Sequence, residues 1–307
     1  MFRKVPRVGI MPPLVVGVFV SDIKIQKELV VGYHGECLDG SVAAFAAYEC
    51  YGDSAEYRPL LHRNPPPADL EGRDFILLDF AYSSRIVAEF RAKSTTILDH
   101  HDTLIDDLRE KPGVLIDLDR SGAGIAWDQL HPAEKRPRLV NYVEDDDLGR
   151  WNLPWSKEVR CFLGIVHAET AVNDFAAWQE LREEMETGPG FQNLVEKGRD
   201  MYAHKLAEVK RIIQQTSEFI KLHDQIVPAV NSVNCVDDIC EHFGPKYPFA
   251  VVWHGIPGGR YKYSLRTCRD DVHVGEIAKT FGGGGRQRAA AFYSEHAVFQ
   301  LPGVKRI

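Results

Sequence analysis

Three residues that can bind a metal follow one another in the segment Asp99-His100-His101. They come directly after the apolar, β-branched run 96–98, which is typical of a buried strand. In open α/β sheets, binding sites lie at the carboxyl ends of the strands. A carboxylate and two imidazoles at that point predict a site for a divalent cation, although adjacent histidines by themselves would equally fit a polar loop.

Two other predicted strands end in residues of the same kind. The run 29–33 leads into the segment 34–40, and the run 75–78 leads into an aspartate. Because the carboxyl ends of parallel strands meet at one edge of a sheet, we expect these side chains to converge: His34, Asp39, Asp79, Asp99 and His100. Carboxylates and imidazoles without thiolate pairs suit Mn²⁺, Mg²⁺ or iron better than structural zinc. Two divalent ions would use the whole set.

A second feature suited to chemistry lies near the C-terminus, where the four glycines 282–285 precede two arginines. Consecutive glycines leave backbone N–H groups uncovered and allow positive φ, so this segment can wrap an anion. Guanidinium groups match phosphate oxygens with two parallel hydrogen bonds. The predicted phosphate-binding residues are Gly283, Gly284, Gly285, Arg286 and Arg288, together with Arg266 from a neighbouring predicted strand. A glycine-rich hairpin turn with surface arginines is the alternative interpretation.

Strands and helices alternate through the first half of the chain, which predicts βαβ units and a mostly parallel sheet. The expected strands are 29–33, 75–78, 96–99 and 114–117, and the expected helices are 42–48, 83–92, 121–127 and 175–185. A long helical pattern over 191–220 is followed by expected strands 249–253 and 261–266 and a helix over 274–279. The fold class is therefore α/β: a mostly parallel N-terminal sheet, a helical connector, and a smaller C-terminal α/β domain with a mixed sheet.

The expected organisation has four parts. Residues 1–27 form a leader, interpreted as disordered; 28–188 form the metal-binding domain; 189–222 form the helical connector; and 223–307 form the substrate-binding domain. The leader is basic and contains an apolar run, 8–20, that is too short for a membrane span and holds Pro12-Pro13. We therefore expect no membrane association. An organelle-targeting segment stays open as an alternative.

Composition narrows the class of protein. The 307 residues are 44% hydrophobic and 26% charged, which is ordinary for a soluble globular protein. The 6 cysteines show no paired spacing, so we expect a reducing compartment, the cytoplasm, rather than a disulfide framework. The formal net charge of −7 argues against a protein that coats long nucleic acid, because that mode needs a broad basic surface.

Four motifs in this order resemble the DHH phosphoesterase superfamily with its DHH-associated C-terminal domain. They are the first motif His34-x-x-Cys37-x-Asp39-Gly40, the strand-end Asp79, the segment Asp99-His100-His101, and the segment Phe281-Gly282-Gly283-Gly284-Gly285. The resemblance covers roughly residues 28–293, and its first motif matches a variant pattern, His-x-x-Cys-x-Asp-Gly. It implies a DHH domain, a DHH-associated domain, and a Mn²⁺-dependent phosphodiesterase that resembles an exonuclease.

The resemblance also implies roles for individual residues. Asp99 would orient the site, and His101 would be the histidine on the substrate side, so that the catalytic residues are Asp99, His100 and His101. An Asp-x-Asp motif of related proteins matches Asp145 and Asp147, of which Asp145 is the preferred ligand, whereas the residues alone fit a solvated acidic face equally well. The implied metal positions are His34, Cys37, Asp39, Asp79, His100, Asp145 and Asp147.

Three positions depart from the usual pattern of the superfamily. Cys37 stands where most relatives have an aspartate, which places a soft ligand in a site of hard ligands and weakens one metal position. Arg286 stands where the glycine motif usually ends in histidine, and Ala291 stands where glycine is usual. Arginine binds phosphate but does not donate a proton at neutral pH, so the substrate or its cleavage step is open to change.

These observations predict a phosphoesterase that hydrolyses short oligonucleotides or a related nucleotide phosphodiester. Two Mn²⁺ ions, or Mg²⁺ or another divalent ion, would activate the attacking water. One alternative is a phosphoanhydride hydrolase that acts on pyrophosphate or polyphosphate. The other is a catalytically weak member that binds a nucleotide as a sensor or scaffold. The expected partner is a small nucleotide-phosphate substrate, and the sequence leaves a monomer and a homodimer equally open.

Overall fold

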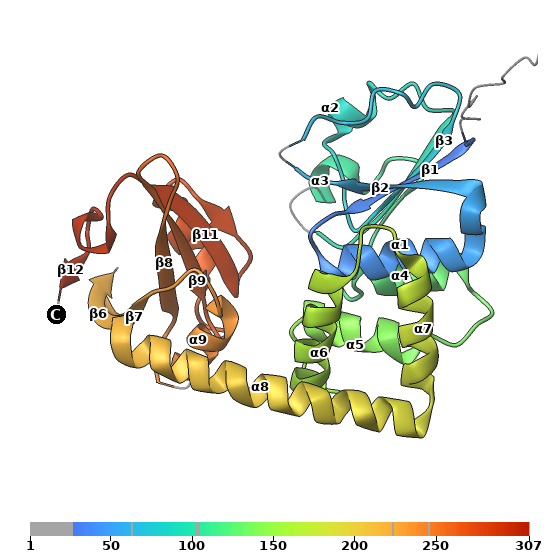
Figure 1. The fold of residues 1–307 in the computed structure, drawn as a ribbon. Helices are drawn as coiled ribbons and strands as arrows, with labels where there is room; N and C mark the ends of the chain where they lie inside the picture. The colour runs from blue at the N-terminus through green and yellow to red at the C-terminus, as the bar shows by residue number, and fades with distance from the viewer. Residues whose placement is uncertain (1–26, 63, 102–104, 223, 245, 307) are drawn as a thin grey trace, which may run out of the picture.

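The computed structural model describes residues 27–62, 64–101, 105–222, 224–244 and 246–306. Almost all of the expected leader, 1–26, lies outside the described residues. Two β-sheets dominate the structure, and the helix α8 (Gly188–Thr216) runs between the parts of the chain that hold them (Figure 1). Within the described ranges, no helix combines the length and the apolar character needed to cross a lipid bilayer.

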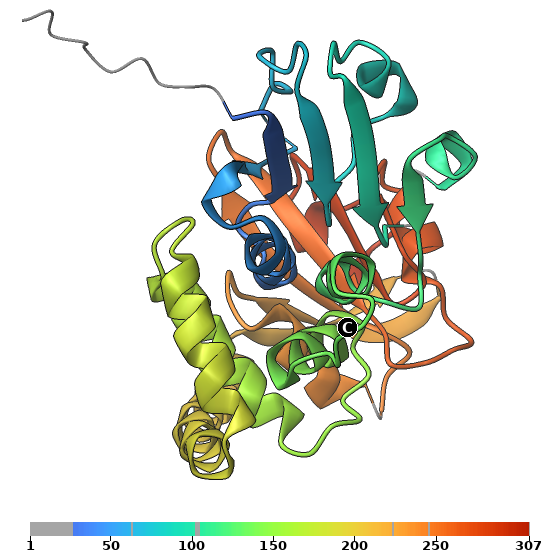
Figure 2. The same cartoon turned by 90° about the vertical axis from the view of Figure 1, so that its right-hand side faces the viewer.

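The N-terminal sheet has five parallel strands in the order β2-β1-β3-β4-β5, and these strands lie side by side in Figure 2. Their bounds are β1 Leu29–His34, β2 Ala55–Leu60, β3 Asp74–Leu78, β4 Ser94–Asp99 and β5 Val114–Ile116. The expected parallel sheet is confirmed. The sequence analysis missed β2, whose residues AEYRPL carry charges and a proline; at an edge of the sheet, a proline is tolerated.

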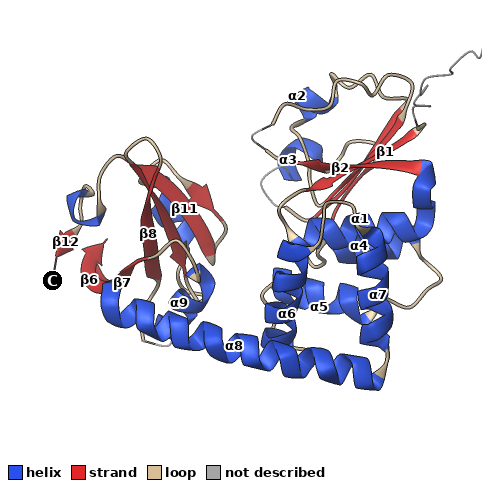
Figure 3. Ribbon diagram, in the orientation of Figure 1, coloured by secondary structure: helices blue, strands red, loops and turns tan. Residues whose placement is uncertain are grey.

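Helices cover both faces of this sheet (Figure 3). On one face the core contains Val31 and Tyr33 of β1, and on the other it contains Val30, because successive side chains of a strand point to opposite sides. The first face is covered by α1 Leu38–Tyr51, α4 Gly122–Leu130, α5 Arg138–Asp147, α6 Ser156–Glu169 and α7 Phe175–Glu186. The second is covered by α2 Ser84–Val87 and α3 Ile105–Leu108.

The C-terminal sheet is mixed, as expected. Its order is β10-β11-β9-β8-β7-β6-β12, and the pairing is antiparallel except between β7 and β8. The bounds are β6 Ser217–Leu222, β7 Gln225–Asn231, β8 Ala250–Ile256, β9 Arg260–Arg266, β10 Gly284–Gly285, β11 Ala289–Ser294 and β12 Lys305–Arg306. Two helices, α9 Val236–Phe243 and α10 Val274–Lys279, and two short 3₁₀ turns, η1 Gly52–Ser54 and η3 Val298–Gln300, complete the fold.

Two expected helices have different bounds in the structure. The helix expected over 83–92 is α2, which has 4 residues. It ends because Glu89 and Phe90 donate to carbonyls three residues back, which tightens the chain into a turn before β4. The connector helix ends at Thr216 rather than at 220, because 217–222 pair with β7 as β6. Here the pairing of strands overrides the helical pattern.

The helix α8 has 29 residues and is about 43 Å long at 1.5 Å per residue. Thr187 caps its N-terminus by accepting a hydrogen bond from the Gly190 N–H, and Pro189 occupies the first turn, where its missing N–H costs nothing. In the second half of α8, Lys205 Nζ lies 2.6 Å from Asp238 Oδ2 of α9. Beside it, Lys157 of α6 pairs with Glu241 of α9. The helix and these ion pairs connect the part that holds the parallel sheet to the part that holds the mixed sheet.

Candidate metal centre

Acidic, histidine and cysteine side chains gather at the carboxyl ends of β1, β3 and β4. The strand ends supply His34, Asp79 and Asp99, and the residue after β4 supplies His100. The loop between β1 and α1 supplies Cys37, the first turn of α1 supplies Asp39, and the end of α5 supplies Asp147. These residues are up to 113 positions apart in the sequence, from 34 to 147. Together with His101 they include three overlapping groups, and the ligand atoms of each group lie within 4.8 Å of one another. The groups are His34, Cys37 and Asp79; Asp79, His100 and His101; and Asp39, His100 and Asp147.

Asp79 lies at the centre of this cluster and is 1% exposed. Its Oδ1 is 3.2 Å from His100 Nε2, and its Oδ2 is 3.5 Å from His34 Nδ1. Its backbone has φ of 54°, a left-handed conformation that aspartate adopts more readily than bulkier residues. Burial acts to raise the pKa of Asp79, but the close imidazoles of His100 and His34 outweigh burial and hold that pKa below its usual value. The carboxylate is therefore ionised at neutral pH.

The hydrogen bonding at the centre is incomplete. Among the described residues, the buried atoms Asp79 Oδ1, Asp79 Oδ2, His34 Nδ1 and His100 Nδ1 have no hydrogen-bond partner. Buried polar atoms without partners are rare in proteins and cost about 1–3 kcal/mol each. Oxygen and imidazole nitrogen atoms placed in this way fit a bound divalent cation, which would satisfy several of them together. The residues present therefore fit the metal that the sequence predicts.

Asp39 is held by the N-terminus of α4. Its two carboxylate oxygens accept hydrogen bonds from the N–H groups of Gly122 (2.6 Å) and Ala123 (3.0 Å), and Asp39 Oδ2 lies 3.8 Å from His100 Nε2. Burial raises the pKa of Asp39 well above its usual value, and the negative charges of Asp79 and Asp147 raise it further. Carboxylates are thus forced together in a buried place, which favours a cation among them.

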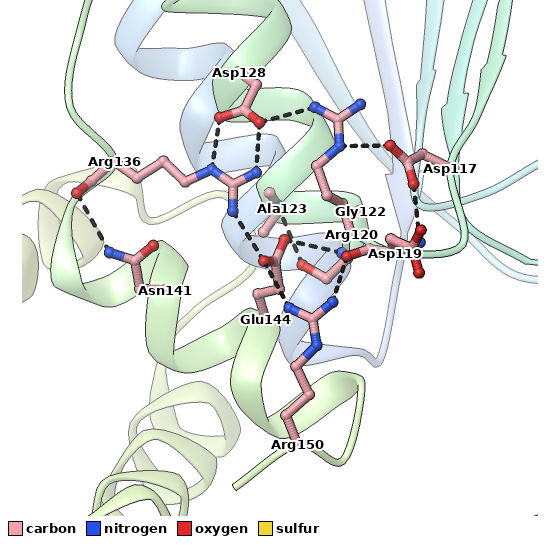
Figure 4. A network of polar contacts seen from close by, with 12 residues as sticks. Asp117, Asp119, Arg120, Gly122, Ala123, Asp128, Arg136, Asn141, Glu144 and Arg150 are labelled. Atoms are coloured by element: carbon pink, nitrogen blue, oxygen red, sulfur yellow. Dashed lines mark hydrogen bonds and ion pairs between the residues drawn. The ribbon is translucent and has the colours of Figure 1, made fainter. Parts of the chain in front are cut away.

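A network of ion pairs fixes this helix terminus (Figure 4). Asp128 pairs with Arg120 Nη1 at 2.8 Å and with Arg136, and Arg136 Nη1 is also 3.0 Å from Glu144 Oε1 of α5. Glu144 Oε2 in turn accepts from the Ser121 N–H at 3.2 Å. The sequence predicted a helix over 121–127, but it did not indicate that the N-terminus of this helix positions Asp39.

Gly122 allows the close approach of α4 to the cluster. A Cβ at this position would lie 2.4 Å from Asp79 Cβ and 2.8 Å from Asp39 Oδ2. We therefore expect Gly122→Ala to displace both carboxylates, to lower Mn²⁺ affinity at least tenfold, and to cost about 1–3 kcal/mol of the free energy of unfolding through overpacking. Calorimetric titration with Mn²⁺ and denaturant unfolding measure the two effects.

The matched control for that variant is Gly164→Ala in α6, where a Cβ would meet nothing within 4 Å. This control should bind Mn²⁺ like the parent and gain a little stability, since alanine in a helix is favoured over glycine by about 0.5–1 kcal/mol. Equal Mn²⁺ affinities of the Gly122 variant and the parent would contradict the described packing of α4 against Asp79.

Asp99 and His101 form a pair at the edge of the cluster. Asp99 Oδ1 accepts hydrogen bonds from His101 Nδ1 at 2.8 Å and from the backbone N–H groups of His100 (2.7 Å) and His101 (3.3 Å). A carboxylate only accepts, so the Nδ1 of His101 carries a proton. Burial lowers the pKa of His101, but the hydrogen bond with Asp99 and the charges of Asp99 and Asp79 outweigh burial and raise it. The raised pKa therefore favours the protonated form of His101.

The acidic segment 145–147 corrects one expectation. Asp145, the preferred ligand by resemblance, lies outside the cluster: its carboxylate accepts hydrogen bonds from the N–H groups of Asn152 (2.8 Å) and Leu153 (3.3 Å) and from the hydroxyl of Ser156. It fixes the loop before α6. Asp147 Oδ2 instead lies 3.4 Å from His100 Nε2. Residues two apart on a helix point to opposite sides, so only one of these two can face the metal site.

Cys37 lies in the cluster with His34 and Asp79. Burial raises the pKa of its thiol, and the charge of Asp79 raises it further. Without a cation the group is therefore a neutral thiol, whereas a bound ion would favour the thiolate. The departure from the usual aspartate thus changes the ligand type at this position but not its location.

The glycine–arginine segment meets the cluster through one arginine. The charge of Arg286 lowers the pKa of both His101 and Asp147, which places its guanidinium within electrostatic range of the cluster. Arg266 instead lies 2.7 Å from Asp237 Oδ1, and Arg288 pairs with Asp270. These two arginines pair with aspartates outside the metal cluster, and their role in binding phosphate stays a prediction.

The three glycines of the predicted cradle have separate roles. A Cβ at Gly283 would lie 2.3 Å from the Ala291 carbonyl oxygen, and one at Gly285, whose φ is 147°, would lie 2.4 Å from the Ala289 oxygen. Gly284 has open space beside it. Close packing against β11 thus requires two of the glycines, and the remaining backbone carries Arg286 towards the cluster.

His62 is a residue near the site that the sequence did not indicate. Its ring centroid is 5.7 Å from that of His34, and its ring stacks on the ring of Phe80 with the two centroids 4.3 Å apart. Burial and then the neighbouring His34 lower the pKa of His62, so the ring is neutral at pH 7. No spacing in the sequence points to this contact, because the loop that carries His62 is placed by tertiary packing.

Comparisons with known proteins place this fold. No family model matches the chain. It is 27% identical over 295 residues to an uncharacterized protein of Acanthamoeba polyphaga mimivirus, a match that covers 85% of this chain and 66% of the relative, slightly less than two thirds of its length. Among solved structures, it is similar to a pGpG-specific phosphodiesterase from Vibrio cholerae, with a TM-score of 0.51, 14% identity, and coverage of 87% of this chain and 93% of the other.

A second solved structure is the DHH domain of a member of the s1p family of ribosomal proteins. It gives a TM-score of 0.50 at 12% identity, and the match covers 88% of this chain and 83% of the other. At such identities the likeness concerns the fold. The arrangement of the two sheets and the ordered motifs agree with it, and the chain therefore has the fold of the DHH superfamily.

Proposed function

We propose that this protein is a metal-dependent phosphoesterase that hydrolyses short oligonucleotides or a related nucleotide phosphodiester. The observation that carries the proposal is the convergence of Asp39, Asp79 and Asp147 on His100, with buried atoms of Asp79 and His100 left without partners. The fold, which is also that of a pGpG-specific phosphodiesterase, supports the same class of substrate. A net negative charge is consistent with a small substrate rather than a long nucleic acid.

The residues that would hold Mn²⁺, or another divalent ion, fall into two neighbouring sets. One set is His34, Cys37 and Asp79, and the other is Asp39, His100 and Asp147. The two sets adjoin where Asp79 Oδ1 lies 3.2 Å from His100 Nε2. Bound divalent cations lower the pKa of a water and offset the charge of a phosphate. The chain itself buries the carboxylates of Asp39 and Asp79, and the N-terminus of α4 fixes Asp39.

His101 and Arg286 act on the phosphate in this proposal. The Nδ1 of His101 is engaged by Asp99, so its Nε2 is left to donate to a phosphate or leaving-group oxygen. The raised pKa of His101 favours the protonated form of that donor, and the positive charge of Arg286 adds attraction for the phosphate. Asp99 therefore orients a proton donor.

A panel of substrates tests this function. The purified chain is incubated with Mn²⁺ and RNAs of two to five nucleotides, and in parallel with pyrophosphate and polyphosphate, with a chelator as the blank. We expect the parent to release mononucleotides from the RNAs. His101→Ala should lower the kcat of this reaction by roughly 10²–10⁴-fold, the usual contribution of a positioned proton donor.

The control is His204→Ala, which replaces an exposed histidine of α8. It should retain the activity of the parent. Phosphate release from pyrophosphate without any nucleotide release from RNA would replace the diesterase proposal with a phosphoanhydride hydrolase, and a chain that binds nucleotides but releases neither product would leave only a binding protein.

A further inference from the structure

A cavity of about 300 Å³ adjoins the metal centre on the side of α1, α6 and α7. The backbone of Gly35 and Glu36 forms part of its wall, and these residues lie between His34 and Cys37 of the cluster. Ser41 also lines it, two residues after Asp39 in the first turns of α1. The cavity and the cluster are thus both built on the same short segment of the chain, residues 33–41.

Apart from Glu36, the polar side chains that line this cavity are neutral, among them Ser41, His167, Tyr33 and Asn173. His167 Nε2 lies 3.0 Å from Ser41 Oγ, and burial lowers the pKa of His167, so its ring is uncharged at neutral pH. The Tyr33 hydroxyl donates to Asn173 Oδ1 at 2.8 Å, and burial raises the pKa of Tyr33 to about 12. Among the described lining residues, the one ionised group is the carboxylate of Glu36.

Aromatic rings complete the wall. Phe175 and Trp178 of α7 line the cavity and are 6% and 3% exposed, so that their positions are fixed by the core. Cavities of this size with apolar rings and a few polar groups are typical of sites for small organic ligands. No lysine or arginine is among the described lining residues, so the cavity offers no cationic side chain to a phosphate. It suits a neutral, flat group with hydrogen-bonding edges.

We propose that this cavity binds the nucleoside part of the substrate, with the base against the rings of Phe175 and Trp178 and its polar edges near Ser41, His167 and Asn173. The inference rests on the proposed function for the phosphate, which would lie at the cluster. It adds a determinant of the substrate class: the molecule carries an uncharged heterocycle next to the phosphate that is cleaved. Purely inorganic substrates would leave the cavity unused.

The test fills the cavity from its rim. Ala171 is exposed and lines the cavity, whereas Ala176 is exposed on α7 and does not line it. Ala171→Trp and the matched control Ala176→Trp are compared in kcat and KM for a dinucleotide and for bis(p-nitrophenyl) phosphate, a diester without a nucleoside. We expect Ala171→Trp to raise KM for the dinucleotide at least tenfold and to change kcat/KM for the nucleoside-free diester less than twofold. The control should change neither quantity.

A second measurement does not depend on hydrolysis. Guanosine and adenosine carry no phosphate. In calorimetric titrations, both should bind to the parent and to Ala176→Trp, and both should bind more weakly to Ala171→Trp and to His167→Ala. Diester hydrolysis with equal dinucleotide KM values for both tryptophan variants would overturn the inference and leave the proposed function intact. If no diester is cleaved, the proposed function fails, and nucleoside binding alone then tests the inference about the cavity. Loss of nucleoside binding in Ala171→Trp would support a nucleoside site in the cavity. Absence of nucleoside binding in the parent would overturn that site.

Discussion

Asp79→Ala is expected to abolish both metal binding and hydrolysis. Asp79 belongs to the set with His34 and Cys37, and its Oδ1 lies 3.2 Å from His100 Nε2 of the other set, so its loss removes an anionic ligand from the first set and a charged neighbour from the second. Because a catalytic cation contributes several kcal/mol to the transition state, and each 1.36 kcal/mol is a factor of ten in rate, we expect kcat/KM to fall by ~10³-fold or more. Elemental analysis should find less than one ion per chain in this variant.

The same variant is expected to be no less stable than the parent when metal is removed. In the metal-free chain, Asp79 is buried beside Asp39 and Asp147, and its charge contributes to the raised pKa of both. Its removal relieves that repulsion and two unpartnered oxygens. Saturating Mn²⁺ at about 100 times Kd should stabilise the parent by about 2.7 kcal/mol and should leave the variant unchanged.

Thermal unfolding with Mn²⁺ and with a chelator measures this difference, and the control is Asp53→Ala, at an exposed aspartate after α1. The control should show the same Mn²⁺-dependent rise in Tm as the parent. A rise in Tm that survives in Asp79→Ala would show that the cation binds elsewhere and would remove the basis of the proposed mechanism.

Asp145→Ala and Asp147→Ala, the same change at two neighbouring positions, should have opposite effects. Asp145 is 5% exposed, and its loss leaves the N–H groups of Asn152 and Leu153 without their acceptor, whereas the hydroxyl of Ser156 keeps the Leu153 carbonyl. We expect a cost of about 3 kcal/mol in the free energy of unfolding, with Mn²⁺ affinity kept among the folded molecules. Asp147 faces His100, so its replacement should lower Mn²⁺ affinity at least tenfold and leave stability in a chelator unchanged.

Each variant is the control for the other, since both remove one carboxylate from the same helix. Urea unfolding in a chelator and Mn²⁺ titration separate the two roles. Loss of Mn²⁺ affinity in Asp145→Ala, together with an unchanged midpoint in urea, would restore the expectation that the sequence resemblance suggested.

The sequence was sufficient to predict the strand-end residues of the site. Parallel register brings His34, Asp79 and Asp99 to one edge, because strands of a parallel sheet end together. The choice between Asp145 and Asp147 was wrong because it depends on how α5 is rotated about its axis, which packing against α4 and α6 decides. Nor does the sequence record that the Arg266 and Arg288 side chains lie beside Asp237 and Asp270, respectively.

Other parts were beyond sequence patterns for similar reasons. The strand β2 has no clean alternation of apolar and polar residues, since only one of its edges is paired. The N–H groups of Gly122 and Ala123 that hold Asp39 belong to the backbone, so no residue type reports them. Both features come from tertiary arrangement rather than from local preference.

The length of α8 has a mechanical consequence. The metal centre and Arg286 lie in parts of the chain that this one helix joins, so the helix works as a lever between them. For a rod of about 43 Å, a bend of about 5° at one end moves the other by about 4 Å, which is more than the length of a hydrogen bond. Small angular changes near Ser217 would therefore decide whether the guanidinium reaches a phosphate at the carboxylates or stops short of it.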